Sequence, residues 1–242
     1  MQNGIYLSLS SQLALNRRLE TVANNVANAT TPGYRSEEIK FESLISPNTN
    51  EPTAFSSIGD TYLSRNTGEI VGTGNPLDLA VQGEAFLAIL TPAGTVYTRD
   101  GRLQMRPEGD LQTLNGYPVL DAGGAPVQLD PNGGPPTIGR DGTISQNGQQ
   151  VAQVGLFTID PAARLTRFEN SGVVPDRAAV PALDFTRNGV MQGYIERANI
   201  NPMMELSRLI MIQRQFEAVT NAIGSTENTM TDAIRTLGGS SS

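Results

Sequence analysis

The stretch PMMELSRLIMIQRQFEAVTNAIGSTENTMTDAIRTL, residues 202–237, carries the clearest periodic pattern in the chain. Alternating steps of three and four residues select ten positions, seven of them apolar: Leu206, Leu209, Gln213, Phe216, Thr220, Ile223, Glu227, Met230, Ile234 and Leu237. This is the spacing of the a and d positions of a coiled coil. At 1.5 Å per residue such a helix extends roughly 54 Å. The pattern therefore favours a partner helix of similar length.

Both ends of this stretch have residues typical of helix ends. Asn201 is a suitable N-cap, Pro202 fits the first helical position, and Glu205 lies in the first turn, where the helix dipole favours a negative charge. Gly238 and Gly239 follow the last periodic residue, and glycine is common just beyond a helix end. We therefore predict one long helix that begins at Pro202 and ends at these glycines.

A second helix is predicted at the start of the chain, over roughly residues 3–29. Four apolar residues fall on one stripe at spacings of four, three and four, and two more extend the stripe upstream: Leu15, Leu19, Val22 and Val26, then Ile5 and Leu9. Thr31 precedes Pro32 and is therefore biased towards extended geometry, and Gly33 is a further breaker. The helix is predicted to end near Ala29.

The middle of the chain has the pattern of short strands separated by turns. Five stretches are predicted strands: residues 85–90, 95–99, 103–106, 116–120 and 154–159. Five turn sequences lie between or beside these stretches: Asp100-Gly101, Glu108-Gly-Asp110, Asn115-Gly116, Asp141-Gly142 and Asn147-Gly148. This alternation is typical of an all-β domain.

We therefore predict an α+β protein, in which the N- and C-terminal helices form an α-helical coiled-coil domain and the middle forms an all-β domain. The predicted divisions are the N-terminal helix at 1–30, an extended connector at 31–67, the β-rich domain at 68–190 and the C-terminal helix at 191–242. The connector is rich in Pro, Ser, Thr and Asn, which favour turns and extended chain over a packed core.

The composition argues against most enzyme chemistry and against nucleic acid as a partner. The chain has no His, Cys or Trp and a single Lys, Lys40, so the commonest general base and the usual zinc ligands are missing. A net charge of −7 repels a phosphate backbone. The longest apolar run, 85–90, is too short to cross a bilayer, and the first twenty residues lack the pattern of a cleaved signal. We predict no catalytic residue, cofactor, metal or direct membrane insertion.

Several carboxylates could still act as an acid/base pair or bind a metal, the latter in the stretch Asp130-Pro-Asn-Gly. They are Asp100, Glu108, Asp110, Asp121, Asp130 and Asp141. Each lies in a predicted turn beside Gly, Pro or Asn, where Asp commonly accepts hydrogen bonds from the local backbone. The structural role in turns is the favoured interpretation.

Two arrangements of the terminal helices remain open. They could pack on each other as an antiparallel pair within one chain, or they could pack with helices of other subunits. Gln213, Thr220 and Glu227 interrupt the apolar stripe at seven-residue steps, and polar positions of this kind fix register in multi-helix assemblies. This observation favours assembly.

Two N-terminal motifs resemble the signature of the flagellar rod and hook proteins: VANNVAN at 22–28 and TPGYR at 31–35. Further stretches agree in the same order, namely NPLDLAVQG at 75–83, YTRDG at 97–101 with GYPVL at 116–120, and QGYIERANIN at 192–201. With the C-terminal helix, the resemblance covers nearly the whole chain. Within the family, the length and the residues RQFE at 214–217 are most similar to a proximal-rod protein, and a distal-rod protein is the nearest alternative.

The resemblance implies a structural subunit whose terminal helices pack with neighbouring subunits as the inner tube of a hollow axle that transmits torque. It implies copies of the chain and other rod proteins as partners, export without a cleaved signal by the flagellar type III apparatus, and a place in the basal body, in the periplasm. The assembly interface is then Leu9, Leu15, Leu19, Val22, Val26, Leu206, Leu209, Phe216, Ile223, Met230, Ile234 and Leu237. Asp at Phe216 or Ile223 is predicted to abolish assembly.

An alternative from another class is an envelope β-domain that binds or cleaves an acidic or glycan ligand, with the helices as a stalk. Such a domain requires a convergent pair of carboxylates. Replacing Asp100 and Asp141 together with Asn would separate the two interpretations, because an active site would lose all activity whereas turns would lose only some stability.

Overall fold

The computed structural model describes residues 2–40, 43–46, 53–56 and 60–238. The chain divides into two compact units. Unit 1 consists of Met1–Ala27, Glu37–Thr61 and Asn201–Ser242, and unit 2 consists of Asn28–Ser36 and Tyr62–Ile200. The protein thus combines terminal helices with a β-rich middle, as the sequence predicted.

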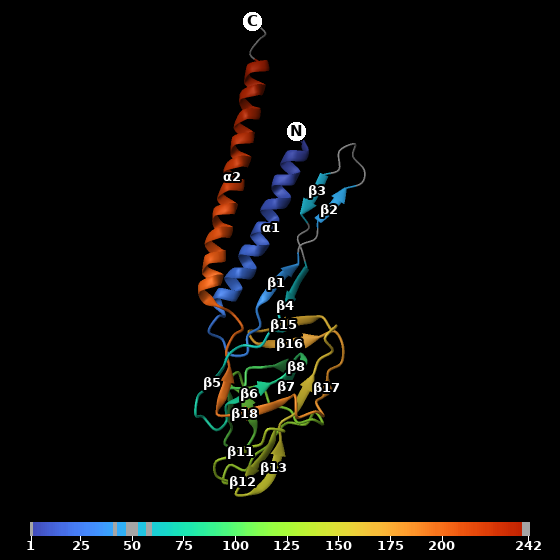
Figure 1. Ribbon diagram of the computed structural model, residues 1–242, viewed down its shortest axis with the longest axis vertical. Coiled ribbons are helices and arrows are strands. Elements are labelled where there is room, and N and C mark those ends of the chain that lie inside the picture. Colours follow the sequence, from blue (N-terminus) through green and yellow to red (C-terminus); the bar gives the residue numbers. More distant parts are fainter. Residues whose placement is uncertain (1, 41–42, 47–52, 57–59, 239–242) are drawn as a thin grey trace. The chain divides into compact units, whose positions relative to one another are not determined.

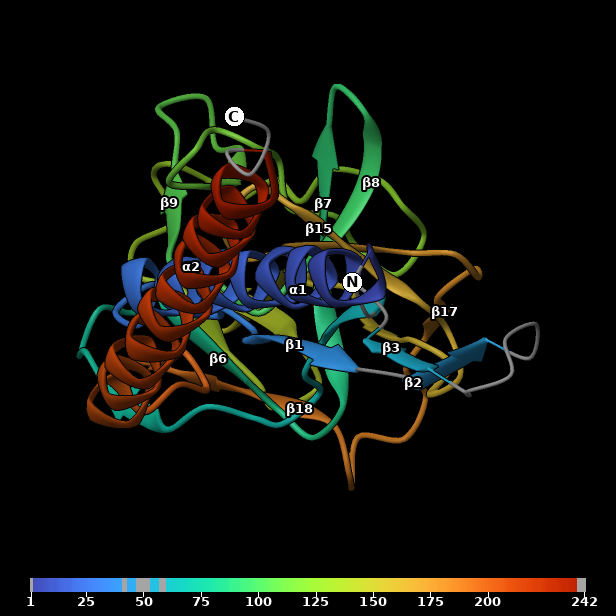
Figure 2. The same ribbon diagram turned by 90° about the horizontal axis from the view of Figure 1, so that it is seen from above.

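Unit 1 is built on the two predicted helices, α1 (Gln2–Ala27) and α2 (Pro202–Gly238). They run antiparallel and pack side by side, and α2 continues past the beginning of α1 (Figures 1 and 2). The unit also contains β1 (Glu37–Lys40) and an antiparallel hairpin of β2 (Ser43–Ser46) and β3 (Thr53–Ser56). The division between the units falls within β4 (Asp60–Leu63).

The predicted start of α2 is confirmed in detail. The side-chain oxygen of Asn201 accepts the backbone N–H groups of Met203 at 3.1 Å and Met204 at 3.3 Å. These donors have no partner inside the helix, so an N-cap that satisfies them stabilises the first turn. The first helix ends at Ala27, two residues before the predicted position, because the next residues turn: the N–H of Thr31 donates to the carbonyl of Asn28 at 3.0 Å.

Unit 2 contains a six-stranded antiparallel sheet in the order β15-β16-β8-β7-β14-β17. Its strands are β7 (Ala85–Thr91), β8 (Gly94–Thr98), β14 (Leu156–Thr158), β15 (Leu165–Phe168), β16 (Gly172–Pro175) and β17 (Val180–Pro181). Smaller antiparallel pairs join β5 (Ile70–Gly72) to β19 (Tyr194–Glu196), β6 (Leu79–Gln82) to β18 (Gly189–Gln192), and β9 (Leu103–Met105) to β10 (Leu111–Thr113). A three-stranded sheet contains β11 (Thr137–Ile138), β12 (Thr143–Gln146) and β13 (Gln149–Gln153).

The core of unit 2 comes from these strands. Leu79, Leu87, Leu111 and Ile144 are completely buried and belong to one apolar cluster. The hairpin turn between β12 and β13 has positive φ at both central residues, 52° at Asn147 and 77° at Gly148, as a type I′ turn requires. The predicted strands near 85, 95, 103 and 154 and this turn are therefore confirmed.

The prediction of a continuous strand at 116–120 was wrong. This stretch instead forms isolated bridges to three different partners, with Pro118 opposite Gln112, Val119 opposite Ile89, and Leu120 opposite Pro126. Because Pro118 has no N–H, it cannot complete a regular ladder. Val119 is nevertheless fully buried, so its apolar character reflects a role in the core.

Candidate assembly surface

The face of α2 that packs within unit 1 has its buried positions at a heptad spacing, but in a different phase from the one that the sequence pattern predicted. Its buried or half-buried side chains are Glu205, Leu209, Ile212, Phe216, Val219 and Ile223. The sequence pattern had placed Leu206, Gln213 and Thr220 at alternate inward positions, but these three side chains are exposed. Leu209, Phe216 and Ile223 thus lie inward as predicted. The other three inward positions are each one residue earlier in the sequence than predicted.

The predicted interface residues fall into three groups. Seven are buried or half-buried: Leu15, Leu19, Val22, Val26, Leu209, Phe216 and Ile223. Three are exposed, Leu9 at 50%, Leu206 at 40% and Ile234 at 71%. The side chains of Met230 and Leu237 lie outside the described residues. The interface prediction therefore selects both residues that pack within the chain and residues that face outward.

Two open grooves follow the contact between α1 and α2. One, of about 520 Å³, has Val22, Met211 and Ile212 in its walls, and the other, of about 430 Å³, has Leu15, Ala218 and Val219. Arg18 and Gln215 line both grooves. The second groove is mainly apolar, whereas the first also has charged walls, among them Glu37, Glu38 and Arg208, so the helix pair leaves both apolar and polar surface open.

The outward face of α2 is also apolar near its beginning. Met203, Met204, Leu206, Ile210 and Met211 are between 40% and 73% exposed. A helix with apolar residues on two faces needs more than one packing partner. Within the described residues, α1 covers only one of these faces.

Glu205 has a different environment from the one its sequence position suggested. Its side chain is buried, one carboxylate oxygen pairs with Arg208, and the other, Oε2, has no hydrogen-bond partner. The only role predicted for it from the sequence was a favourable interaction with the helix dipole in the first turn. Its position four residues before Leu209 and seven before Ile212, on the inward heptad face, was the signal for burial.

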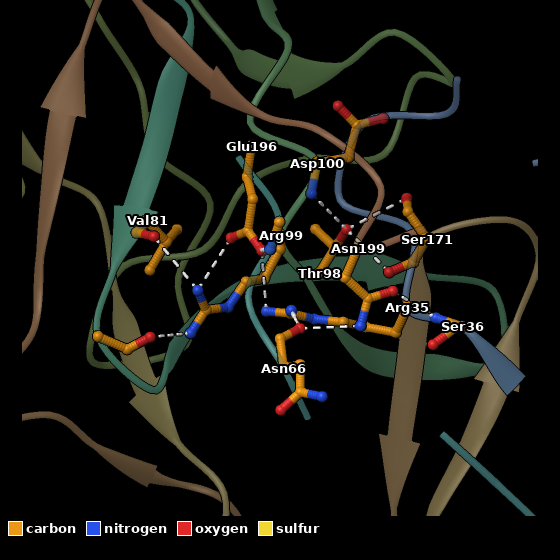
Figure 3. A network of polar contacts seen from close by, with 12 residues as sticks. Arg35, Ser36, Asn66, Val81, Thr98, Arg99, Asp100, Ser171, Glu196 and Asn199 are labelled. Atoms are coloured by element: carbon orange, nitrogen blue, oxygen red, sulfur yellow. Dashed lines mark hydrogen bonds and ion pairs between the residues drawn. The ribbon is translucent and has the colours of Figure 1, made fainter. Parts of the chain in front are cut away.

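A second polar site, which sequence reasoning missed, lies inside unit 2 (Figure 3). We call it the junction and define it as Arg35, Asn66, Arg99, Glu196 and Asn199. The Glu196 carboxylate pairs with Arg35 at 3.1 Å and with Arg99 at 2.9 Å, and it accepts the N–H of Gly68 at 2.8 Å. All three charged side chains are no more than 3% exposed.

Backbone bonds join the same segments. The N–H of Gly33 donates to the carbonyl of Glu196 at 2.8 Å, and the N–H of Asn199 donates to the carbonyl of Tyr34 at 3.3 Å. The side chain of Asn199 accepts the N–H of Ser36 at 2.7 Å and donates to the carbonyl of Asn66 at 2.9 Å. Segments 33–36 and 196–199 are therefore held directly to each other.

The two guanidinium groups of the junction are deeply desolvated. Burial lowers the pKa of Arg35 to about 10, although Glu196 acts to raise it and Arg99 acts to lower it further. Arg35 also donates to the carbonyl of Asn66, and Arg99 donates to the carbonyls of Val81 at 3.2 Å and Gly83. The Nε atoms of both arginines have no hydrogen-bond partner. The Glu196 carboxylate is therefore the main group that compensates the two buried positive charges.

Four of the six turn carboxylates are engaged within their own turns, whereas Asp110 accepts the side-chain amide of Gln128 at 3.0 Å. Asp100 pairs with Arg102 at 2.6 Å, Asp121 accepts the N–H groups of Gly123 and Ala125, and Asp130 accepts that of Asn132. These bonds support the structural interpretation of the turn sequences. Among the residues that the structure describes, no group of three or more acidic side chains could hold a metal ion.

Asp141 provides a pH test of this interpretation. The hydroxyl and the N–H of Thr143 donate to it at 2.7 Å and 3.1 Å, and these bonds hold its pKa below the ordinary 3.8. The carboxylate therefore contributes stability above pH 3.8 that is lost as the pH falls through the lowered pKa. Thr143→Val is expected to raise the pKa of Asp141 in an NMR titration.

Thr158→Val is the control, because the Thr158 hydroxyl donates to the carbonyl of Val180 and to no carboxylate. It should leave the pKa of Asp141 unchanged. A pKa above the ordinary value in the unmodified chain would contradict the turn interpretation and would instead indicate a neighbouring carboxylate.

No helix within the described ranges is long and apolar enough to cross a membrane. Three family models match the chain in the order of its parts. They are the flagella basal body rod protein at residues 5–35, the flagellar hook protein FlgE/F/G D1 domain at 80–146, and the flagellar basal body rod FlgEFG protein C-terminal region at 191–236.

Curated relatives match over their full length. The flagellar basal-body rod protein FlgF of Mesorhizobium japonicum is 49% identical over 100% of both chains, and that of Rhizobium meliloti is 45% identical over 99% of this chain and 100% of its own. The rod protein FlgG of Bacillus subtilis is 25% identical over 97% of this chain and 98% of its own. The identity is thus much higher to these FlgF proteins than to this FlgG. The chain belongs to the FlgF family of flagellar basal-body rod proteins.

Proposed function

We propose that this chain is a structural subunit of the proximal rod of the bacterial flagellar basal body. The full-length identity of 49% to a FlgF protein carries the proposal. The packing of α1 and α2 supports it, because a subunit that polymerises through its helices needs apolar helix surface that its own fold leaves open. The subunit acts mechanically, as one element of a hollow axle that transmits torque.

The assembly surface is the α1–α2 pair. In the rod the two helices and those of neighbouring subunits form a coiled coil in which the exposed face of α2 and the grooves beside Arg18 and Gln215 are filled. A surface that contacts a different surface on the next subunit produces an open helical polymer. Of the predicted interface residues, the exposed Leu9, Leu206 and Ile234 contact neighbouring subunits, whereas the seven inward ones hold α1 and α2 together.

The partners are copies of the chain and other rod proteins. The subunit reaches its place in the periplasm by export through the flagellar type III apparatus, without a cleaved signal. The chain has no catalytic role. The envelope-ligand alternative has less support, because Asp100 and Asp141 are each bound within their own turns.

Amide exchange on the purified soluble chain tests the role of the helices. The amides of α1 and α2 are expected to exchange faster than those of β7 and β8, because the helices lack the neighbours that cover them in the rod. Protection of the helices should rise in isolated basal bodies. Helices that are as protected in the soluble chain as β7 and β8, and no more protected in basal bodies, would contradict assembly through this surface.

A further inference from the structure

The junction gathers the parts of unit 2 that adjoin unit 1 in the sequence. Three such parts exist: residues 28–36, the stretch that begins at Tyr62, and the stretch that ends at Ile200. The first contributes Arg35, the second Asn66, and the third Glu196 and Asn199. Every covalent connection from α1 and α2 into unit 2 therefore leads to this one site within a few residues.

Glu196 has a special place in the junction because of its charge. It is one carboxylate between two guanidinium groups, and the three side chains are almost completely buried. Removing one arginine leaves a neutral pair, whereas removing the carboxylate leaves two buried positive charges without compensation. The second change is far more costly in a medium of low polarity.

We propose that Glu196 makes the docking of segments 33–36 and 196–199 a single event, so that the two segments are held in unit 2 together or released together. The carboxylate binds Arg35 of the first segment, and its own backbone carbonyl accepts the N–H of Gly33. In the rod subunit proposed above, on which this consequence rests, load from α1 and load from α2 reach one shared anchor.

Amide exchange of Glu196→Gln in the purified full chain tests this coupling. The amides of Gly33, Ser36 and Asn199 are the reporters, since each donates a bond across the two segments. Their exchange is expected to rise together by roughly tenfold or more, while Val96 in the core of β8 changes less. A rise at Gly68 alone, whose N–H donates to the replaced carboxylate, would overturn the proposal.

Arg35→Met gives a second variant that leaves the Glu196–Arg99 pair neutral. Exchange is expected to rise at Arg197, whose N–H donates to the carbonyl of Glu69 outside segment 33–36, as well as at Gly33 and Ser36. A rise confined to segment 33–36 would overturn the coupling. Arg177→Met is the matched control, because it removes an exposed arginine that pairs with Asp160 at 2.6 Å, and it should leave all three reporters unchanged.

The double variant Arg35→Met with Glu196→Gln tests the electrostatic cause. It retains only one buried guanidinium, so its reporters are expected to exchange more slowly than those of Glu196→Gln alone. Faster exchange in the double variant would contradict the charge argument. All of these measurements use the soluble chain, so they are independent of rod assembly. If a helix variant loses rod assembly while the exchange of Gly33, Ser36 and Asn199 is unchanged, the result bears on the proposed function and not on the coupling.

Discussion

Cells whose only copy of this chain carries Phe216→Asp are expected to be non-motile. Phe216 is half-buried on the inward face of α2, in the heptad series that includes Leu209 and Ile223. A carboxylate at this position is desolvated without a partner. The resulting loss in the free energy of unfolding is several times larger than that of a typical surface substitution. Both the α1–α2 pair and the assembly that depends on it should fail. Swimming in soft agar, with isolation of basal bodies, measures the result.

Ile234→Asp separates assembly from folding. Ile234 is 71% exposed in the chain, so a carboxylate there should leave the stability of the soluble chain almost unchanged while it still abolishes incorporation into basal bodies. Leu183→Asp, at a side chain that is 89% exposed in unit 2, is the control and should swim. Motile cells with either Phe216→Asp or Ile234→Asp would contradict assembly through α2.

Gly33→Ala is expected to cause a large loss of stability, because one methyl group adds both backbone strain and a clash. Gly33 has φ of 69°, and a Cβ there would lie 2.2 Å from the N atom of Asp100 and 2.5 Å from the carbonyl carbon of Arg99. These neighbours are backbone atoms, which cannot rotate away. The left-handed conformation alone costs about 1–2 kcal/mol for a residue with Cβ, and the clash should bring the total to about 3 kcal/mol or more.

Comparison with Gly74→Ala separates the cost of the clash at Gly33 from the cost of the left-handed backbone conformation. Gly74 has φ of 75° and nothing within 4 Å of a Cβ, so it carries the conformational cost without the clash. Urea denaturation of both variants, monitored by circular dichroism, should show a clearly smaller loss for Gly74→Ala. Equal losses would show that the close approach between Gly33 and segment 99–100 contributes nothing.

Features with local causes could be predicted from the sequence. The capping of α2 depends on Asn201 and the next three residues, and the turn at Asn147-Gly148 depends on which residues tolerate positive φ. The apolar periodicity likewise located both helices. These features need no knowledge of distant parts of the chain.

The phase of the helix contact could not be predicted, because α2 is apolar on two faces. Leu206 and Ile212 fit a heptad equally well, and only the position of α1 decides which one faces inward. The junction depends on pairing between residues 35, 99 and 196, which are far apart in the sequence. Its only local signal was a charged residue within each of three short motifs, TPGYR, YTRDG and QGYIERANIN, and that signal does not identify the partners.

The antiparallel packing of α1 on α2 also determines when the helix pair can form. Val22 and Ile212 line the same groove although they come from opposite ends of the chain, and all of unit 2 lies between the two helices in the sequence. On the ribosome, α1 is therefore made first but finds its partner only after α2 has been made. Incomplete chains present an uncovered apolar helix, which other proteins can bind.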